Sequence, residues 1–170
     1  MRTLPPYHDD PLYIGALKES VEASLAALDF EPQAIVASFH GMPERTLQLG
    51  DPYHCHCQKT ARLLGDALGR ELVVAFQSRF GRAKWLGPAT DATLAELPGS
   101  GVTRVAIVAP GFSADCLETL EELAIRGRET FIAAGGTHFA SLPCLNDGPP
   151  GMAMLRALIA RELAGWLKAS

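Results

Sequence analysis

The sequence predicts an α/β fold of three layers, in which a four-stranded parallel sheet carries helices on both faces. Short apolar runs such as IVASF, LVVAF and VAIVA lack polar and apolar alternation, which is typical of strands buried on both faces. These runs alternate with segments of helical periodicity, so right-handed crossovers should join the strands in a Rossmann-like arrangement. With 170 residues, and about 150 residues per domain, we expect one domain over residues 1–170.

The individual elements follow from the apolar spacing along the chain. Asp10 is expected to cap a first helix that begins at Pro11. Its inward residues are Ile14, Leu17, Val21, Leu25 and Leu28. Further helices are expected from Asp51, over about 91–97, over about 116–133 and after Pro150. The four strands are expected at residues 34–39, 72–76, 104–108 and 138–142.

The same spacing predicts which side chains of the later helices point inward. For the helix after Asp51 they are Tyr53, Cys57, Thr60, Ala61, Leu64 and Leu68. For the helix at 116–133 they are Leu117, Leu120 and Ala124. For the last helix they are Met152, Leu155, Ile159, Leu163 and Trp166.

Composition argues against several classes of protein. The chain has 15 Lys and Arg against 19 Asp and Glu, a formal net charge of -4, so we expect no nucleic-acid partner. An uncharged stretch over 130–145 contains Gly135, Gly136, His138 and Pro143, which argues against a spanning helix there. The first ten residues lack the apolar core of a signal peptide, and the four cysteines are expected to be reduced. We therefore expect a cytoplasmic protein.

Polar residues and glycines follow the first three strands. The segments are HGMP at 40–43, QSRFG at 77–81 and PGFS at 110–113. Ligands bind at the carboxyl ends of the strands in parallel sheets of this kind, so the sequence predicts a site at that edge.

A histidine and a set of carboxylates at this edge are side chains of the kinds that transfer protons or bind metal ions. His40 can accept a proton or bind a metal ion through nitrogen, although it could also be a hydrogen-bonded loop histidine. Asp115 and Glu118 fit a capping box at a helix start. Alternatively, Glu118 and Glu122, four residues apart on one face, could accept protons or pass a cation.

Other motifs carry less information. Cys55 and Cys57 resemble half of a zinc site, but no second pair exists and Cys57 falls on the apolar face, so we expect no structural zinc. Trp85 either packs under its loop or offers a flat face to a planar ligand. The sequence has no phosphate-binding glycine motif and no G-x-S-x-G motif, which makes a nucleotide-binding domain a distant alternative.

Five segments, in this order, resemble the ferrochelatase family. They are SFHGMP at 38–43, GDPY at 50–53, FQSRFG at 76–81, WLGP at 85–88 and PGFSADCLETLEE at 110–122, and Leu145-Asn146 closes the series. The resemblance covers essentially the whole chain but only the carboxy-terminal half of the family, in which two Rossmann-like halves enclose a porphyrin cleft. It implies a chelatase-type domain whose partner, the amino-terminal half, is missing from this sequence.

The resemblance implies a lyase of heme biosynthesis that inserts ferrous iron into a porphyrin such as protoporphyrin IX. It implies that His40 and Glu118 are catalytic and hold the iron, which is a substrate. Five further residues are implied to surround the substrate: Trp85, Gln77, Ser78, Asp115 and Glu122. Two positions depart from the pattern, since Cys116 stands where some relatives have histidine and Arg126 where some continue an acidic row. No tightly bound cofactor is implied, and four scattered cysteines argue against a [2Fe-2S] cluster.

Two alternatives within this resemblance stay open. The chain could be a non-catalytic half that binds porphyrin or metal, or a small homodimeric chelatase that completes its cleft with a second copy. A porphyrin is a large flat disc, and one half contacts one side of it, so we expect the chain alone to metalate porphyrin slowly. Apolar surface left open by the missing half should favour dimerisation.

Overall fold

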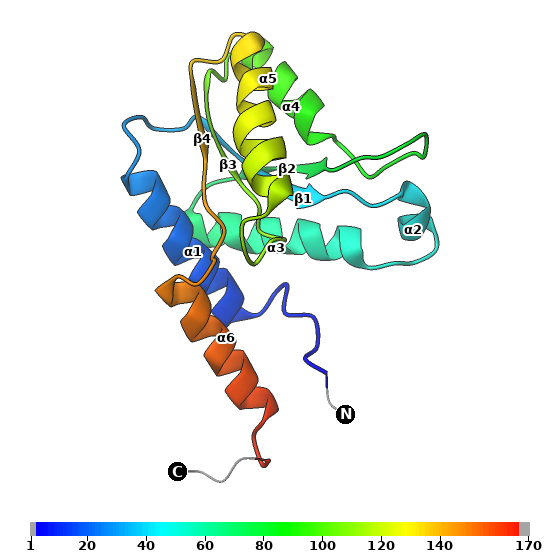
Figure 1. Ribbon diagram of the computed structural model, residues 1–170, viewed down its shortest axis with the longest axis vertical. Helices are drawn as coiled ribbons and strands as arrows, with labels where there is room; N and C mark the ends of the chain where they lie inside the picture. The colour runs from blue at the N-terminus through cyan, green and yellow to red at the C-terminus, as the bar shows by residue number, and fades with distance from the viewer. Residues whose placement is uncertain (1–2, 167–170) are drawn as a thin grey trace.

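The chain folds around a four-stranded sheet in which every strand pairing is parallel (Figure 1). A computed structural model describes residues 3–166, and the ends of the expected domain 1–170 lie outside the described residues. The strand order is β2-β1-β3-β4. The strands span Ala34–His40 for β1, Leu72–Gln77 for β2, Arg104–Val108 for β3 and His138–Ser141 for β4. The predicted parallel α/β fold is therefore confirmed.

Helices cover both faces of the sheet. One face carries α1, Pro11–Ala26, and α3, Tyr53–Leu68. The other face carries α4, Thr90–Glu96, the π-helix η2, Glu118–Gly127, and α5, Arg128–Ala133. The remaining helices are α2, Glu44–Gln48, the 3-10 turn η1, Pro98–Ser100, and α6, Pro149–Glu162. Among the helices of residues 3–166, none is both long enough and apolar enough to cross a membrane.

Alternate residues of the central strand β1 enter two different cores. Ile35 and Phe39 face α1 and α3, where Val21, Cys57 and Ala61 surround them. Val36 faces the opposite layer. There it joins Leu94 of α4, Leu123 of η2 and Phe131 of α5. Because both faces of β1 are packed, its carboxyl end has a fixed position.

The first helix begins as predicted, but it ends at Ala26, before Leu28, which was expected on its inward face. Asp10 is its N-cap, since its carboxylate accepts a hydrogen bond from the backbone N–H of Leu12 at 3.0 Å, and Pro11 is its first residue. The helix α2 and the turn η1 were not predicted. Both are too short for an apolar period to develop, and neither buries a residue.

The helix expected over 116–133 is two helices of different kinds. In the π-helix η2, each N–H bonds to the carbonyl five residues back, so the period exceeds the 3.6 residues that the prediction assumed. Residues four apart are buried, namely Thr119, Leu123, Gly127 and Phe131. The predicted inward face was therefore wrong. Leu117 and Leu120 are 73% and 56% exposed, and Ala124 is half-buried.

The predicted inward face of the last helix was also wrong. α6 buries Gly151, Met154 and Leu158. Of the residues expected inside, Met152 and Ile159 are exposed, and Leu155 is half-buried against the core shared with α1. Leu163 and Trp166 lie beyond the end of α6, and Trp166 is exposed. Most of the circumference of α6 is apolar, so the spacing fits more than one face, and the contact with α1 decides which face is buried.

Candidate active site

The carboxyl ends of β1, β2 and β3 meet at one edge of the sheet, as predicted. The chain leaves β1 for β2 on one side and then returns to β3 on the other, so a topological switch point lies between β1 and β3. His40 is the last residue of β1 and lies in register with Gln77, the last residue of β2. The predicted site residue His40 thus stands beside the switch point, where ligands bind in such sheets.

His40 is oriented through its backbone and its ring. The hydroxyl of Tyr53 donates a hydrogen bond to the His40 carbonyl at 2.8 Å. The ring Nδ1 lies 2.8 Å from the carbonyl oxygen of Gly41. A carbonyl oxygen only accepts hydrogen bonds, so Nδ1 carries a proton, and in the neutral form of the ring Nε2 keeps its lone pair. The half-buried imidazole is thereby set to accept a proton or bind a metal ion through Nε2.

Glu118 lies at the start of η2 and faces the same edge. A hydrogen bond from the side chain of Cys116 lowers the pKa of the Glu118 carboxyl, and the electrostatic influence of His40 lowers it further. The carboxyl is therefore ionised at neutral pH, and it lies close enough to His40 to interact with it electrostatically. His40 and Glu118, the two residues predicted to be catalytic, thus lie within electrostatic range of each other at this edge.

Gln77 holds Glu118 in place. Its side-chain amide donates a hydrogen bond to the carbonyl of Glu118 at 2.9 Å. The Gln77 amide oxygen accepts one from the hydroxyl of Ser38 at 2.7 Å, and that hydroxyl also lies 2.8 Å from the hydroxyl of Thr90. Gln77 is 2% exposed, and both polar atoms of its side chain form hydrogen bonds to protein groups.

Ser78 and Glu122 form a second, separate contact. The backbone N–H of Ser78 donates to one carboxylate oxygen of Glu122 at 2.7 Å, and its hydroxyl donates to the other at 2.6 Å. Ser78 has a positive φ of 60°, which aims both donors at the helix. Glu122 is thus anchored to β2, while Glu118 faces Cys116 and His40.

Asp115 connects the start of η2 to the loop after β4. Its carboxylate accepts hydrogen bonds from Asn146 at 2.7 Å and Thr119 at 3.0 Å, and its N–H donates to Asn146 at 2.8 Å. Burial alone would raise the pKa of Asp115, but hydrogen bonds from Asn146, Thr119 and Cys144 outweigh it and lower the pKa. The expected capping box is absent, because no side chain caps η2 and Leu117 is its N-cap.

Trp85 lies near the loop that follows β1. Its indole N–H donates to the carbonyl of Phe80 at 3.0 Å, which fixes the ring within the 78–88 loop. A cavity of about 520 Å³ opens here, and four predicted site residues are among those lining it: Gln77, Ser78, Trp85 and Glu122. His40, Glu118 and Asp115 are not part of its lining, so the predicted residues fall into two neighbouring groups.

Some residues that shape the site were not assigned a role from the sequence. Asn146 was noticed only as part of a family segment, yet it adopts a φ of +50° and pairs reciprocally with Asp115. An Asn followed by Asp-Gly is a turn signal, and it could have suggested this conformation. Tyr53 was expected in the core rather than bonded to the backbone of His40. The roles of Ser38 and Thr90 could not be predicted from the neighbouring sequence, since their hydrogen-bond partners come from distant segments.

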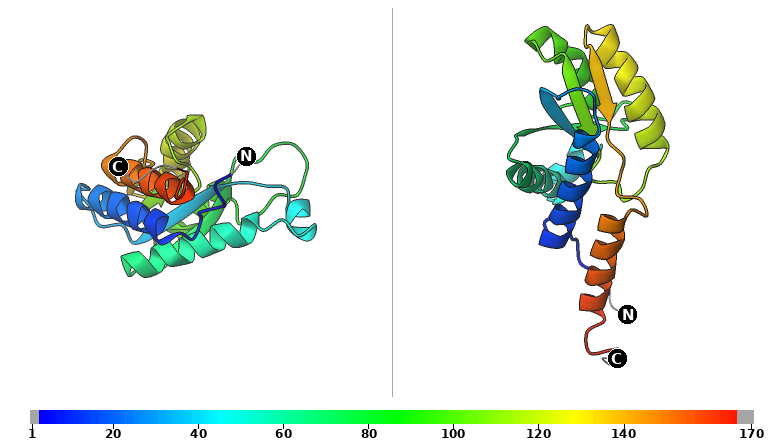
Figure 2. Two further views of the ribbon diagram at one scale, coloured as in Figure 1. Left: turned by 90° about the horizontal axis from the view of Figure 1, so that it is seen from below. Right: turned by 90° about the vertical axis from the view of Figure 1, so that its left-hand side faces the viewer.

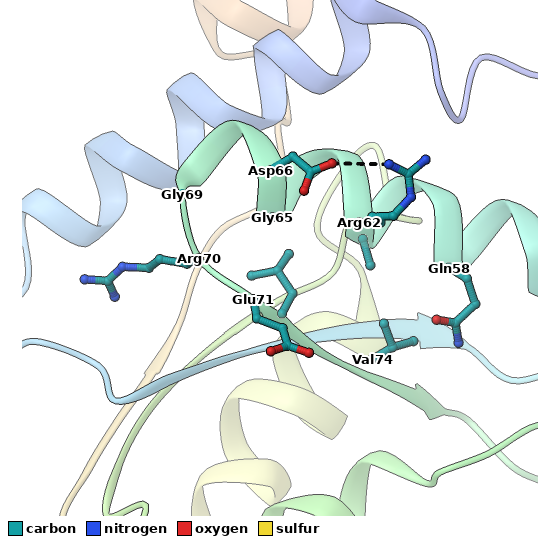
Figure 3. A pocket seen from close by; sticks show the side chains of 10 residues that line it. Gln58, Arg62, Gly65, Asp66, Gly69, Arg70, Glu71 and Val74 are labelled. Atoms are coloured by element: carbon teal, nitrogen blue, oxygen red, sulfur yellow. Dashed lines mark hydrogen bonds and ion pairs between the residues drawn. The ribbon is translucent and has the colours of Figure 1, made fainter.

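A second hollow, of about 540 Å³, lies between α3 and the outer edge of β2 (Figure 3). Two of its arginines are paired, Arg62 with Asp66 at 3.2 Å and Arg70 with Glu31 at 2.6 Å. None of the predicted site residues lines it. We therefore place the candidate site at the strand ends.

Metal binding at the edge rests on two donors. Within residues 3–166, no group of three or more His, Cys, Asp and Glu side chains could hold a metal ion. His40 and Glu118 supply one nitrogen and one carboxylate, a donor set that suits a first-row divalent ion.

A parallel sheet with this histidine and glutamate at its carboxyl edge defines a chelatase-type α/β domain. A family model described as Ferrochelatase matches residues 1–163. The chain is 56% identical over 170 residues to the ferrochelatase of Rhizobium meliloti (strain 1021) and 52% identical to that of Agrobacterium fabrum (strain C58 / ATCC 33970). The alignments cover 98% of this chain but 50% and 49% of those relatives, so the chain spans about half their length. The chain belongs to the ferrochelatase family.

Proposed function

We propose that the chain supplies the histidine–glutamate half of a ferrochelatase, which inserts ferrous iron into a porphyrin in heme biosynthesis. One observation carries the proposal: the free Nε2 of His40 and the ionised carboxylate of Glu118 face one edge of the sheet. On the sequence expectations, we place the reaction in the cytoplasm.

The two groups have complementary tasks. Metalation releases two pyrrole protons while the iron stays ferrous, so a base must lie near the macrocycle nitrogens. The Nε2 of His40 accepts one pyrrole proton, the second passes to solvent water, and the carboxylate of Glu118 holds the incoming ion until the ring nitrogens replace it. Gln77 fixes the backbone of Glu118, and Ser78 holds Glu122 nearby. Trp85 and Asp115 are proposed to shape the substrate surroundings.

Apolar side chains beside Glu118 offer one wall for a flat ring. Leu117 and Leu120 are 73% and 56% exposed on the same stretch of chain. A ligand site normally buries most of its ligand, so the opposite face of the ring needs a second wall. We assign that wall to the half of the family that this chain does not match, which the resemblance identifies as the amino-terminal half.

We propose that no cofactor is tightly bound and that no [2Fe-2S] cluster forms. Cys57 is 3% exposed in the core between α3 and the sheet, and Cys144 is buried in the opposite core. Burial raises the pKa of Cys57 to about 11, which disfavours the thiolate that a cluster needs. Purified protein should be colourless; a brown sample that contains iron and acid-labile sulfide would contradict this.

The deciding experiment adds ferrous iron and protoporphyrin anaerobically, with and without the amino-terminal half of the Rhizobium meliloti ferrochelatase, and follows the porphyrin absorption bands. We expect metalation only with both halves, and its loss in His40→Ala and Glu118→Gln. Porphyrin binding without metalation under both conditions would favour a non-catalytic half. Metalation by a dimer of the chain alone would favour the homodimeric chelatase.

A further inference from the structure

We infer that residues 6–9 form a pH-sensitive strap, which lies across a hollow beside the candidate site and is released when His8 takes up a proton. The strap runs along α3 just before the start of α1 (Figure 2). None of its residues is among those assigned to the proposed reaction. The strap is controlled by two stacked histidines, His8 on the strap and His56 on α3.

Three contacts hold the strap against α3. The rings of His8 and His56 stack with 3.7 Å between their centroids and an interplanar angle of 16°. The hydroxyl of Thr60 donates a hydrogen bond to the His8 carbonyl at 2.7 Å. The ammonium of Lys59 pairs with the carboxylate of Asp9. Of these three contacts, only the histidine stack depends on groups that ordinarily titrate near neutral pH.

The docked position favours the neutral form of His8. Within residues 3–166, its buried Nδ1 has no hydrogen-bond partner, so a proton there would be a buried donor without an acceptor. Its Nε2 lies 3.8 Å from the carboxylate of Asp9, which favours the charged form, but Lys59 already pairs with that carboxylate. Burial, His56 and Lys59 together outweigh Asp9 and lower the pKa of His8.

The direction of the pH effect follows from this lowered pKa. A released His8 has the ordinary pKa of about 6.5, so it binds a proton more readily than a docked one. Docking is therefore strongest above about pH 6.5 and weakens as the pH falls below that value. At pH 5 a released histidine is protonated about 30 to 1, so the released population can grow by up to about 30-fold relative to pH 8. The other titratable side chains around the hollow are tyrosines and a thiol, which are uncharged in this range: Tyr7, Tyr13, Tyr53 and Cys57.

The hollow under the strap lies at the carboxyl edge of the sheet and has a volume of about 200 Å³. The strap lines it together with Phe39 of β1, Gly111 after β3 and Cys57 of α3. Because β1 and β3 flank the topological switch point, the hollow lies beside that point. Phe39 immediately precedes His40 in β1. Release of the strap takes away one wall of the hollow and opens it to solvent next to the candidate site.

Cys57 provides the readout, because it is buried and lines this hollow. The test alkylates the chain with N-ethylmaleimide between pH 8 and pH 5 and measures the label on each cysteine by tandem mass spectrometry. Exposed Cys55, labelled in the same sample, corrects for the smaller thiolate fraction at low pH. We expect the ratio of the Cys57 rate to the Cys55 rate to rise by up to about 30-fold from pH 8 to pH 5.

Two variants and one internal control separate release of the strap from other effects. His8→Phe keeps a flat ring on His56 but takes up no proton, so its labelling ratio should not depend on pH. The matched control is His138→Gln at an exposed position of β4, which should keep the pH dependence of the wild type. Cys144 lies in the opposite core and should stay unlabelled at pH 5. A constant ratio in the wild type, a rise that persists in His8→Phe, or labelling of Cys144 as fast as that of Cys57 would overturn the inference.

Discussion

The loop after β1 leaves no room for a side chain at Gly41. A methyl group there would lie 2.6 Å from the backbone oxygen of Gln77 and 3.3 Å from the ring of Trp85. The N–H of Gly41 donates to that same Gln77 oxygen at 2.7 Å, and the Gly41 carbonyl accepts from the ring of His40. A Gly41→Ala substitution therefore strains the point where the ends of β1 and β2 are joined and where His40 is oriented.

The size of the effect follows from these distances. Ordinary van der Waals contact begins at 3.4 Å, so the two strand ends must separate by roughly 0.8 Å. Overpacking of this kind costs about 1–3 kcal/mol in the free energy of unfolding. Misplacement of a catalytic group by about 1 Å can cost about 100-fold in rate, so we expect metalation to fall by one to two orders of magnitude.

Two measurements test this prediction: urea unfolding of the chain, and anaerobic metalation with the amino-terminal half present. The matched control is Gly15→Ala in α1, where a methyl group meets no atom within 4 Å. It should raise the free energy of unfolding by about 0.5–1 kcal/mol and leave metalation unchanged. If Gly41→Ala unfolded and metalated like the wild type, the argument that this contact sets the position of His40 would be wrong.

Three further outcomes are expected. Glu122→Gln should lower the free energy of unfolding by about 1–3 kcal/mol, because the carboxylate accepts two hydrogen bonds from Ser78; an unchanged urea midpoint would contradict this. The folded-state pKa of Asp115 lies below its unfolded value, so this group stabilises the fold above about pH 4 and loses that effect as pH falls through the folded pKa. Asp115→Asn should therefore flatten the fall in stability between about pH 5 and 3, and an equally steep fall in the variant would count against it. Cys57, with a pKa raised to about 11, should react with a disulfide reagent at pH 8 only on unfolding, whereas exposed Cys55 reacts in the native state; fast labelling of both would refute the core assignment.

The sheet was predictable because its signal is local and strong. Each buried strand reads as an apolar run, and the predicted strands match the observed ones to within one residue at each end. The edge that carries His40 followed from the parallel topology alone. The buried face of α6 was not predictable, since a helix that is apolar around most of its circumference gives no unique direction, and its packing on α1 selects one.

The residues of the candidate site could be predicted from the sequence, but their relative positions and hydrogen-bond partners could not. Spacing placed Glu118 and Glu122 on one α-helical face, as a row that could pass protons or a cation. In the structure, Glu122 is held by Ser78, while Glu118 faces Cys116 and His40. The two carboxylates thus have different partners in the structure, although the α-helix assumed from the sequence placed them side by side on one face.

The π-helix accounts for this difference. Its hydrogen-bond geometry is rare, and such turns occur mostly as short insertions at functional sites, so a ten-residue run needs support from outside the helix. That support comes from Gln77 at the carbonyl of Glu118, from Ser78 at Glu122, and from Asn146 through Asp115 at the start of the helix. These partners lie at or just after the ends of β2 and β4, between about 30 and 45 residues away in sequence, so no local sequence pattern indicates them. The positions of both carboxylates therefore depend on contacts that form only when the strand ends and the helix come together in the folded protein. Sequence periodicity could not predict those contacts, so it predicted the geometry of η2 poorly.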